Sequence, residues 1–352
     1  TLSRRFTLGA AVCALALPSL AQAQQVTLDV LYNLPGFTRF HQPLADAFME
    51  NNPDVTINFL APAVGYNEGQ QQILRSAVTG NLPDVYFSGY NLTTELVEAL
   101  APRDQIVDLA PFIEAEGGQT FLDENFAPSM LALGVVDGKQ YGLPVNASSP
   151  IMYVNADLVR AAGGDPENMP TTFPELIELA KTIHEADPRV AGMSYDIAGW
   201  PDDWLWQAMV YQQGGKLIDT ETNQVAFDNE IGLNGLTMIR QMAAEAGAPT
   251  FDWDQARQQF GAGMTGFLFS TPAHVQTIEG LVGDRFELIT TTFPLDDPEN
   301  GGVPTGGNSA VMLTQDEAKQ QAAWDYIKWV TGPEAQDIIV RITGYLPTNK
   351  RA

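Results

Sequence analysis

The chain of 352 residues has few basic residues, one cysteine and three histidines. Its 18 lysines and arginines stand against 43 acidic residues, giving a net charge of −25, whereas binding to a phosphate backbone needs a basic surface. One cysteine excludes an intramolecular disulfide framework and a thiolate metal cluster, and the scattered His41, His184 and His274 leave little for a zinc site. We therefore expect no nucleic-acid partner, no metal and no cofactor.

A hydrophobic run long enough to span a bilayer is also missing, because no run approaches the roughly 20 residues required. The run at 8–17 follows Arg4 and Arg5 and precedes a small-residue site that ends at Ala23. This pattern predicts a signal peptide over residues 1–23, cleaved after Ala23, and a soluble periplasmic protein. We favour the ordinary secretory route, although paired arginines also suit twin-arginine export.

Strand and helix patterns alternate along the chain in two sets. Val26, Leu28 and Val30 alternate with polar residues as in a strand, and apolar residues over 37–48 recur at helical spacing. The first set continues with strands at 55–60 and 84–87 and helices at 70–78 and 94–100. The second set has strands at 151–154, 266–270 and 287–293 and helices at 174–184, 229–246, 315–330 and 333–342. This order predicts an α/β protein with mainly parallel, helix-covered sheets, in which Thr172 and Glu175 form a capping box.

Two motif matches fail in their context. Residues 261–266 match the glycine pattern of a dinucleotide site, but a helix precedes them and a strand follows, the reverse of what that site needs. Asp219, Glu221 and Asn223 have the alternate spacing of a calcium loop, without its glycine and closing glutamate. We interpret the first as a turn and the second as the solvated tip of a hairpin.

Four loop segments carry a resemblance to a known family. They are LPVNASSPIMYVN at 143–155, TGNLPDV at 79–85, FPEL at 173–176 and GYLPT at 344–348. In their order along the chain, 79–85, 143–155, 173–176 and 344–348, they resemble segments of the family 1 extracellular solute-binding proteins of ABC transporters, and the sequence is most similar to members that bind glycerol 3-phosphate or sugars. The resemblance covers essentially the whole chain after the signal peptide.

The resemblance implies a two-lobe periplasmic binding protein fold of type II, with lobes joined by a multi-strand hinge. We place lobe I at 24–145 plus 287–314 and lobe II at 146–286 plus 315–352. Family chains usually continue with further helices after the Gly-Tyr-Leu-Pro loop, so we expect that C-terminal sequence is missing here. The resemblance also implies a monomer that captures a sugar, polyol or glycerol-3-phosphate-like solute by closure of the lobes. The protein would then deliver this solute to ABC permease membrane subunits.

Matching residue by residue with the glycerol-phosphate binder also implies a set of ligand contacts. The spacing of its tryptophan pair is one residue longer here than in the family pattern, which weakens a glycerol assignment. The predicted contacts are Tyr66, Asn146, Ser148, Trp200, Trp204, Ser270, Thr271, Gly307 and Tyr345. Such a set supplies hydroxyl and amide groups for a polyol and flat apolar faces for its C–H groups.

Other interpretations stay open at this stage. Tyr345 could simply pack its turn, Ser148 could satisfy hinge backbone groups, and one of Trp204 and Trp206 could belong to the core, because residues two apart do not share a helix face. A secreted carbohydrate-active enzyme could use a carboxylate pair such as Asp202 and Asp203, although the helix dipole explains adjacent aspartates at a helix start more simply. A binding protein coupled to a receptor kinase is a third possibility.

Overall fold

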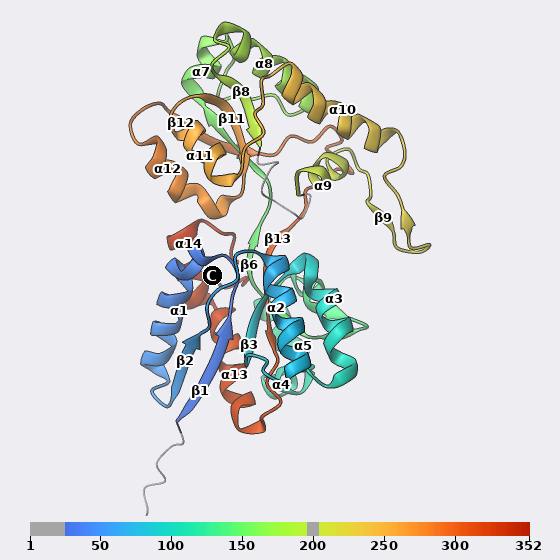
Figure 1. The fold of residues 1–352 in the computed structure, drawn as a ribbon, viewed down its shortest axis with the longest axis vertical. Helices are drawn as coiled ribbons and strands as arrows, with labels where there is room; N and C mark the ends of the chain where they lie inside the picture. The colour runs from blue at the N-terminus through green and yellow to red at the C-terminus, as the bar shows by residue number, and fades with distance from the viewer. Residues whose placement is uncertain (1–24, 196–203) are drawn as a thin grey trace, which may run out of the picture.

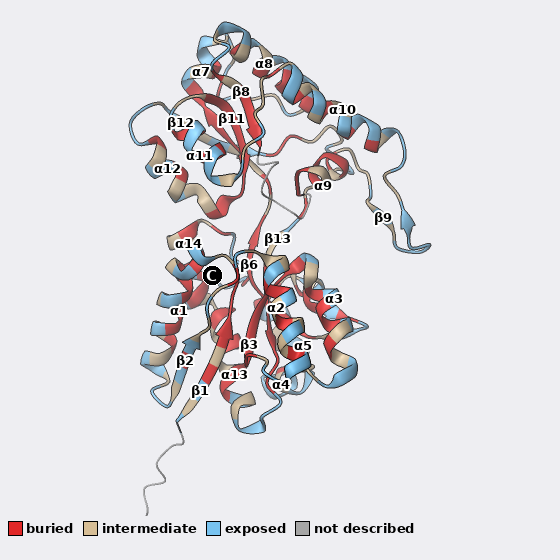
Figure 2. Cartoon of the chain, in the orientation of Figure 1, coloured by how far each residue is buried: buried red, intermediate tan, exposed pale blue. Residues whose placement is uncertain are grey.

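The computed structural model describes residues 25–195 and 204–352, which form two α/β lobes (Figure 1). Each lobe has its own sheet, in which the inner strands β3 (Val85–Gly89) and β11 (Thr265–Ser270) are buried, one edge strand is largely not, and the outer helix faces carry exposed residues (Figure 2). No helix in the described segments is both long enough and apolar enough to cross a bilayer. The two-lobe α/β architecture confirms the predicted fold class.

Lobe I contains a five-stranded sheet with the order β2-β1-β3-β13-β6. Its strands are β1 (Val26–Leu31), β2 (Val55–Phe59), β3 (Val85–Gly89), β6 (Gly142–Ser148) and β13 (Gly306–Met312), beside a small hairpin of β4 (Val135–Val136) and β5 (Lys139–Gln140). Its helices are α1 (Thr38–Asn51), α2 (Tyr66–Thr79), α3 (Tyr90–Leu100), α4 (Ala110–Ala115), α5 (Gln119–Asn125), α6 (Pro128–Leu131), α13 (Glu317–Val330) and α14 (Pro333–Thr343).

Alternation along β1 explains how this sheet buries both of its faces. Leu28 and Val30 pack in one apolar cluster with residues of α1, α13 and α14, whereas Leu31 packs in another with residues of α2 and α3. Successive side chains of a strand point to opposite faces, so helices cover both sides of the sheet. β1 runs parallel to β2 and β3, but β13 is antiparallel to β3 and β6. Since β6 is antiparallel to β13, it runs in the same direction as β1, β2 and β3, so the predicted mainly parallel sheet holds for four strands and fails for β13.

Lobe II contains a four-stranded sheet with the order β12-β7-β11-β8, which is also mixed. Its strands are β7 (Ile151–Asn155), β8 (Ala191–Tyr195), β11 (Thr265–Ser270) and β12 (Leu288–Thr292), with a separate hairpin of β9 (Ile218–Asp219) and β10 (Gln224–Val225). Its helices are α7 (Ala156–Ala161), α8 (Phe173–Ala186), α9 (Trp204–Tyr211), α10 (Glu230–Ala244), α11 (Trp253–Gly261) and α12 (Val275–Val282), with a 3-10 helix η4 (Pro272–His274).

Local signals in lobe II hold to different degrees. Helix α11 ends at Gly261 and β11 begins at Thr265, so the glycine-rich match is a helix-to-strand turn as expected. The hydroxyl of Thr172 bonds to the carboxylate of Glu175 at 3.0 Å and makes no backbone cap, so the predicted capping box is not formed.

Two described segments cross between the lobes, the β6–β7 junction at 149–150 and residues 293–305 between β12 and β13. The predicted lobe boundaries are wrong at β12, because residues Leu288–Thr292 pair with β7 of lobe II rather than with lobe I. They also need correction at the hinge, because β6 pairs with β13 in the lobe I sheet as far as Ser148.

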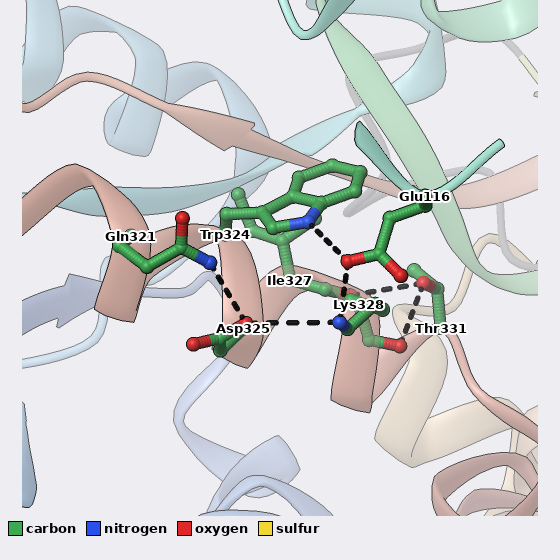
Figure 3. A network of polar contacts seen from close by, with 7 residues as sticks. All are labelled: Glu116, Gln321, Trp324, Asp325, Ile327, Lys328 and Thr331. Carbon is green, nitrogen blue, oxygen red and sulfur yellow. Dashed lines mark hydrogen bonds and ion pairs between the residues drawn. The ribbon is translucent and has the colours of Figure 1, made fainter. Parts of the chain in front are cut away.

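The C-terminal residues 315–352 were assigned to lobe II, and the structure places their helices on lobe I instead. Trp324 and Ile327 of α13 pack with the apolar residues of β1 and α1. Figure 3 shows the polar side of this contact, where Glu116 at the end of α4 accepts hydrogen bonds from Trp324 Nε1 at 3.2 Å and Lys328 Nζ at 2.6 Å. The apolar face of α13 is buried only when it packs against a sheet. In this structure it packs against the face of the lobe I sheet that includes Leu28 and Val30 of β1.

Candidate functional site

A cavity of about 440 Å³ lies between the two lobes and is lined by both. Lobe I contributes Arg39 of α1 and Tyr345, which follows α14, whereas lobe II contributes Trp204 of α9 and Arg257 of α11. Ser148 lines the cavity at the end of β6, where the chain crosses to lobe II. The cavity therefore lies beside the hinge.

Element ends position most of the polar groups around this cavity. Tyr66 and Tyr90 are the first residues of α2 and α3, and Thr271 directly follows β11. In α/β sheets ligands bind in the crevice outside the strand ends, since the loops there are free to carry functional side chains. The described residues follow this rule in both lobes.

The hinge wall of the cavity is held by a compact set of hydrogen bonds. The backbone N–H of Asn308 donates to Asn146 Oδ1 at 2.8 Å, and the hydroxyl of Tyr90 donates to the carbonyl of Asn146 at 2.8 Å. Gly307 between them has φ +130°, and a Cβ there would lie 2.1 Å from the carbonyl oxygen of Asn146. Only glycine fits this position, so the packing of β13 against β6 is itself a reason for Gly307.

Two tyrosines of the cavity wall stay neutral over a wide pH range. Burial raises the pKa of Tyr90 well above its usual value, and the nearby Tyr66 raises it further. Burial likewise raises the pKa of Tyr345, again with a contribution from Tyr66. Both phenols can therefore donate or accept a hydrogen bond at neutral pH without carrying charge.

Arg39 joins the lobes on the side of the cavity away from the hinge strands. Its Nη2 donates to the carbonyl of Ala273 at 2.8 Å, and its Nη1 donates to Thr277 Oγ1 at 3.1 Å. A second contact lies nearby, where the side-chain amide of Gln276 donates to the carbonyl of Arg341. Residues of η4 and α12 therefore touch lobe I directly.

Arg257 stands across the cavity wall in lobe II. Its Nη2 donates to Asp254 Oδ1 at 2.6 Å, and its guanidinium carbon lies 5.5 Å from the ring centre of Trp253. Burial, together with the positive charges of Arg257 and Arg39, lowers the pKa of His274 to about 3. The His274 imidazole is therefore neutral at neutral pH.

The structure brings six of the nine predicted contacts to this cavity and places two others, Asn146 and Ser270, outside its lining. The six that line it are Tyr66, Ser148, Trp204, Thr271, Gly307 and Tyr345. Asn146 is fully buried and supports the hinge wall from behind, and Ser270 lies within β11, 1% exposed. Neither lines the cavity, and their contact with a ligand stays a prediction. Trp200 lies outside the residues that the structure describes.

Several lining residues were missed by the sequence reasoning, including Arg39, Arg257, Trp253 and His274. Arg39 and Arg257 come from the first turn and the second turn of ordinary helices, and neither stands in a recognisable motif. The sequence signal nearest to Arg257 is the capping box of Asp252 and Gln255, which fixes where α11 begins. Nothing in the sequence alone orients that helix towards the cleft.

Metal-ligating groups and a catalytic carboxylate pair are the remaining features that the sequence raised for this site. Within residues 25–195 and 204–352, His, Cys, Asp and Glu side chains form no group of three that could hold a metal ion. The adjacent aspartates considered for a carbohydrate-active enzyme, Asp202 and Asp203, fall outside the described residues.

Comparison with known proteins identifies relatives of the same architecture. Residues 33–337 match the family model described as bacterial extracellular solute-binding protein. The sn-glycerol-3-phosphate-binding periplasmic protein UgpB of Agrobacterium fabrum is 22% identical over 66% of this chain and 54% of its own length. UgpB of Escherichia coli O6:K15:H31 is 22% identical over 99% of this chain and 80% of its own length. The chain thus matches about half of the first relative and four fifths of the second.

Solved structures agree on the fold. UgpB from Mycobacterium tuberculosis in complex with glycerophosphocholine has a TM-score of 0.80 at 19% identity, over 92% of this chain and 79% of that one. Maltose-bound MalE3 of T. maritima has a TM-score of 0.78 at 20% identity, over 92% and 82%. At such identities the likeness establishes the fold alone. Because the family model matches most of the chain, this protein belongs to the bacterial extracellular solute-binding proteins.

Proposed function

We propose that this chain captures a small hydroxyl-rich solute between its lobes and delivers it to the membrane subunits of an ABC importer. The observation that carries the proposal is the cavity of about 440 Å³ whose wall is shared by both lobes beside the hinge. A solute held there contacts lobe I and lobe II at once. It therefore binds the closed arrangement better than an open one and shifts the population towards closure.

The chemistry of the wall supports a sugar, a polyol or a glycerol phosphate as the solute class. Trp204 and Tyr66 supply flat apolar faces, and Ser148 and Thr271 supply hydroxyls. Relatives are named for sn-glycerol 3-phosphate, and structural neighbours hold maltose or glycerophosphocholine. A micromolar dissociation constant corresponds to about 8 kcal/mol, which a few hydrogen bonds and one or two aromatic contacts can supply after ordering costs.

The proposed place of action is the periplasm, with residues 1–23 removed as a signal peptide after Ala23. The family description as extracellular supports export. We further propose that the protein works as a monomer, since one chain supplies both walls of the cavity.

We also propose that the solute is released chemically unchanged. The family comprises solute-binding proteins, which favours a receptor over the carbohydrate-active enzyme considered from the sequence. Incubation of the purified protein with candidate glycosides, followed by chromatography, separates the two. Stoichiometric binding without product supports the receptor, whereas multiple turnovers would establish the enzyme.

The proposal is tested by a thermal-shift screen with sugars, polyols and glycerol phosphates, followed by calorimetric titration of each solute that raises the melting temperature. The decisive variant is Trp204→Ala, because Trp204 lines the cavity. Trp206→Ala is its control, because Trp206 lies on the same helix as Trp204 but does not line the cavity. The Trp206 ring instead packs edge-on against the Phe227 ring, with their centroids 5.5 Å apart.

We expect Trp204→Ala to weaken binding by at least tenfold, because aromatic contacts contribute about 0.5–1.5 kcal/mol beyond the apolar area they bury. Trp206→Ala should change the dissociation constant by less than threefold. Equal effects of both variants would remove the cavity from the proposal, and no stabilisation by any solute of these classes would contradict the proposed function itself.

A further inference from the structure

The charge of the cavity wall is opposite to that of the chain. Acidic residues outnumber basic ones by 43 to 18 in the sequence. Among the described residues lining the cavity, two arginines, Arg39 and Arg257, stand against one carboxylate, Asp254. With His274 neutral, these described groups leave a net positive charge inside a strongly acidic protein.

Neither arginine is fully neutralised where it stands. Arg39 donates to a carbonyl and a hydroxyl, both uncharged, and its buried Nε has no hydrogen-bond partner among the residues described. Arg257 pairs with Asp254, but that carboxylate is 81% exposed whereas the Arg257 side chain is 11% exposed. Water screens an exposed carboxylate, so its attraction only partly compensates the buried guanidinium.

The two guanidinium groups line the same cavity, so their positive charges act on each other. Burial lowers the pKa of Arg39, and the charge of Arg257 lowers it further. Like charges brought together in a partly dehydrated site are unfavourable unless an anion joins them. Arg257 in addition has a buried Nη1 without a hydrogen-bond partner in the described part of the chain.

A guanidinium presents a planar fork of N–H donors that matches a carboxylate or a phosphate. We propose that the solute carries an anionic group, a phosphate or a carboxylate, which is held between Arg39 of lobe I and Arg257 of lobe II. This inference rests on the proposed function and narrows it from hydroxyl-rich solutes in general to acidic ones. Because the arginines come from different lobes, the anionic group also contributes directly to closure.

The test compares matched pairs of solutes by calorimetric titration of the purified protein. Glycerol 3-phosphate is paired with glycerol, and glucuronate with glucose, so that each pair differs by its anionic group. Inorganic phosphate alone is the fifth titrant. The two pairs distinguish a phosphate from a carboxylate source, and repeating the tighter titration at higher salt measures the electrostatic share of binding.

Three variants accompany the wild type. Arg257→Gln removes the charge and retains N–H donors, and Asp254→Asn removes the one carboxylate of the described wall. Arg189→Gln is the control, because Arg189 is 83% exposed in lobe II, pairs with Asp187 and does not line the cavity. The melting temperature of each variant establishes that it is folded.

We expect the acidic member of at least one pair to bind at least tenfold more tightly than its neutral partner. Arg257→Gln should weaken binding of the acidic member at least tenfold more than binding of its neutral partner and so remove most of that preference, and Asp254→Asn should increase it. Arg189→Gln should change neither. If Arg257→Gln fails to fold, the opposite effect of Asp254→Asn still decides.

The anion proposal would be overturned if, in both pairs, the neutral solute bound as tightly as its acidic partner and the ratio of their affinities were the same in Asp254→Asn as in the wild type. That result would leave the proposed function in place. Absence of binding by every sugar, polyol and phosphate tested would overturn both.

Discussion

A single methyl group added at Gly306 probes the junction between the hinge and the proposed site. Gly306 lines the cavity and pairs with Ser148 across β13 and β6. A Cβ at this position would lie 2.8 Å from Ser148 Oγ and 3.3 Å from Trp204 Cζ2. Gly306→Ala therefore pushes on two predicted contacts and requires no unusual backbone conformation.

The expected magnitude follows from these two distances. Carbon atoms in favourable contact are about 3.5–4.0 Å apart, so the Trp204 ring must move by a few tenths of an ångström. The Ser148 hydroxyl can rotate away in the free protein, which limits the loss of unfolding free energy to about 1 kcal/mol. In the closed complex both groups must face the solute. Overpacking there costs about 1–2 kcal/mol, within the usual range, and weakens binding roughly 5- to 30-fold.

Calorimetric titration with the tightest solute of the thermal-shift screen measures this effect. Gly302→Ala is the matched control, since a Cβ at Gly302 meets nothing within 4 Å and Gly302 lies in the crossing segment that leads directly into Gly306. Both changes reduce the entropy of the unfolded chain equally, so that contribution cancels in the comparison. If Gly306→Ala binds as tightly as Gly302→Ala, the junction of Ser148 and Trp204 is not part of the binding site.

Two further predictions concern stability. Lys319→Met should lower the free energy of unfolding in urea by about 1–3 kcal/mol, because it leaves the buried Asp84, 2.9 Å away, without its charged partner. The same change in the exposed pair of Lys139 and Asp108 should cost less than about 1 kcal/mol, and equal costs would contradict the argument. Burial lowers the pKa of His41 to about 3, whereas the unfolded chain binds that proton near pH 6.5. Unfolding free energy therefore falls as pH drops between these values, and His41→Phe should give a shallower fall in melting temperature over that range.

The periodicity of apolar residues in the sequence predicted most of the helices and strands of the fold. The alternation in β1, with Leu28 and Val30 facing one cluster and Leu31 the other, is a local property that sequence reports directly. The strands β8 and β13 were not predicted, because each contains glycine, which is uncommon inside strands. β8 is short and contains Gly192, and β13 begins with Gly306 and Gly307, which resemble a turn. In β13 those glycines serve close approach between strands rather than reversal of the chain.

The residue-by-residue match to the resembling family predicted part of the candidate site. Ser148 and Thr271 were found in this way, and both line the cavity. Arg39 and Arg257 could not be found, because a single arginine on a helix is ordinarily a solvated surface residue. Their meeting depends on how α1 and α11 face each other across two lobes, and no local pattern encodes that arrangement.

The error over residues 315–352 has the same physical origin. Amphipathic patterns predicted both C-terminal helices correctly, but an apolar face does not specify which sheet it covers. What decides the matter is the strand before them, since β13 returns the chain from lobe II into the lobe I sheet between β3 and β6. After that return, Lys319 reaches Asp84 at 2.9 Å and Lys328 reaches Glu116 at 2.6 Å, both in lobe I. Both helices therefore pack on lobe I. Tyr345, which follows them in the chain, lines the cavity as part of the lobe I wall.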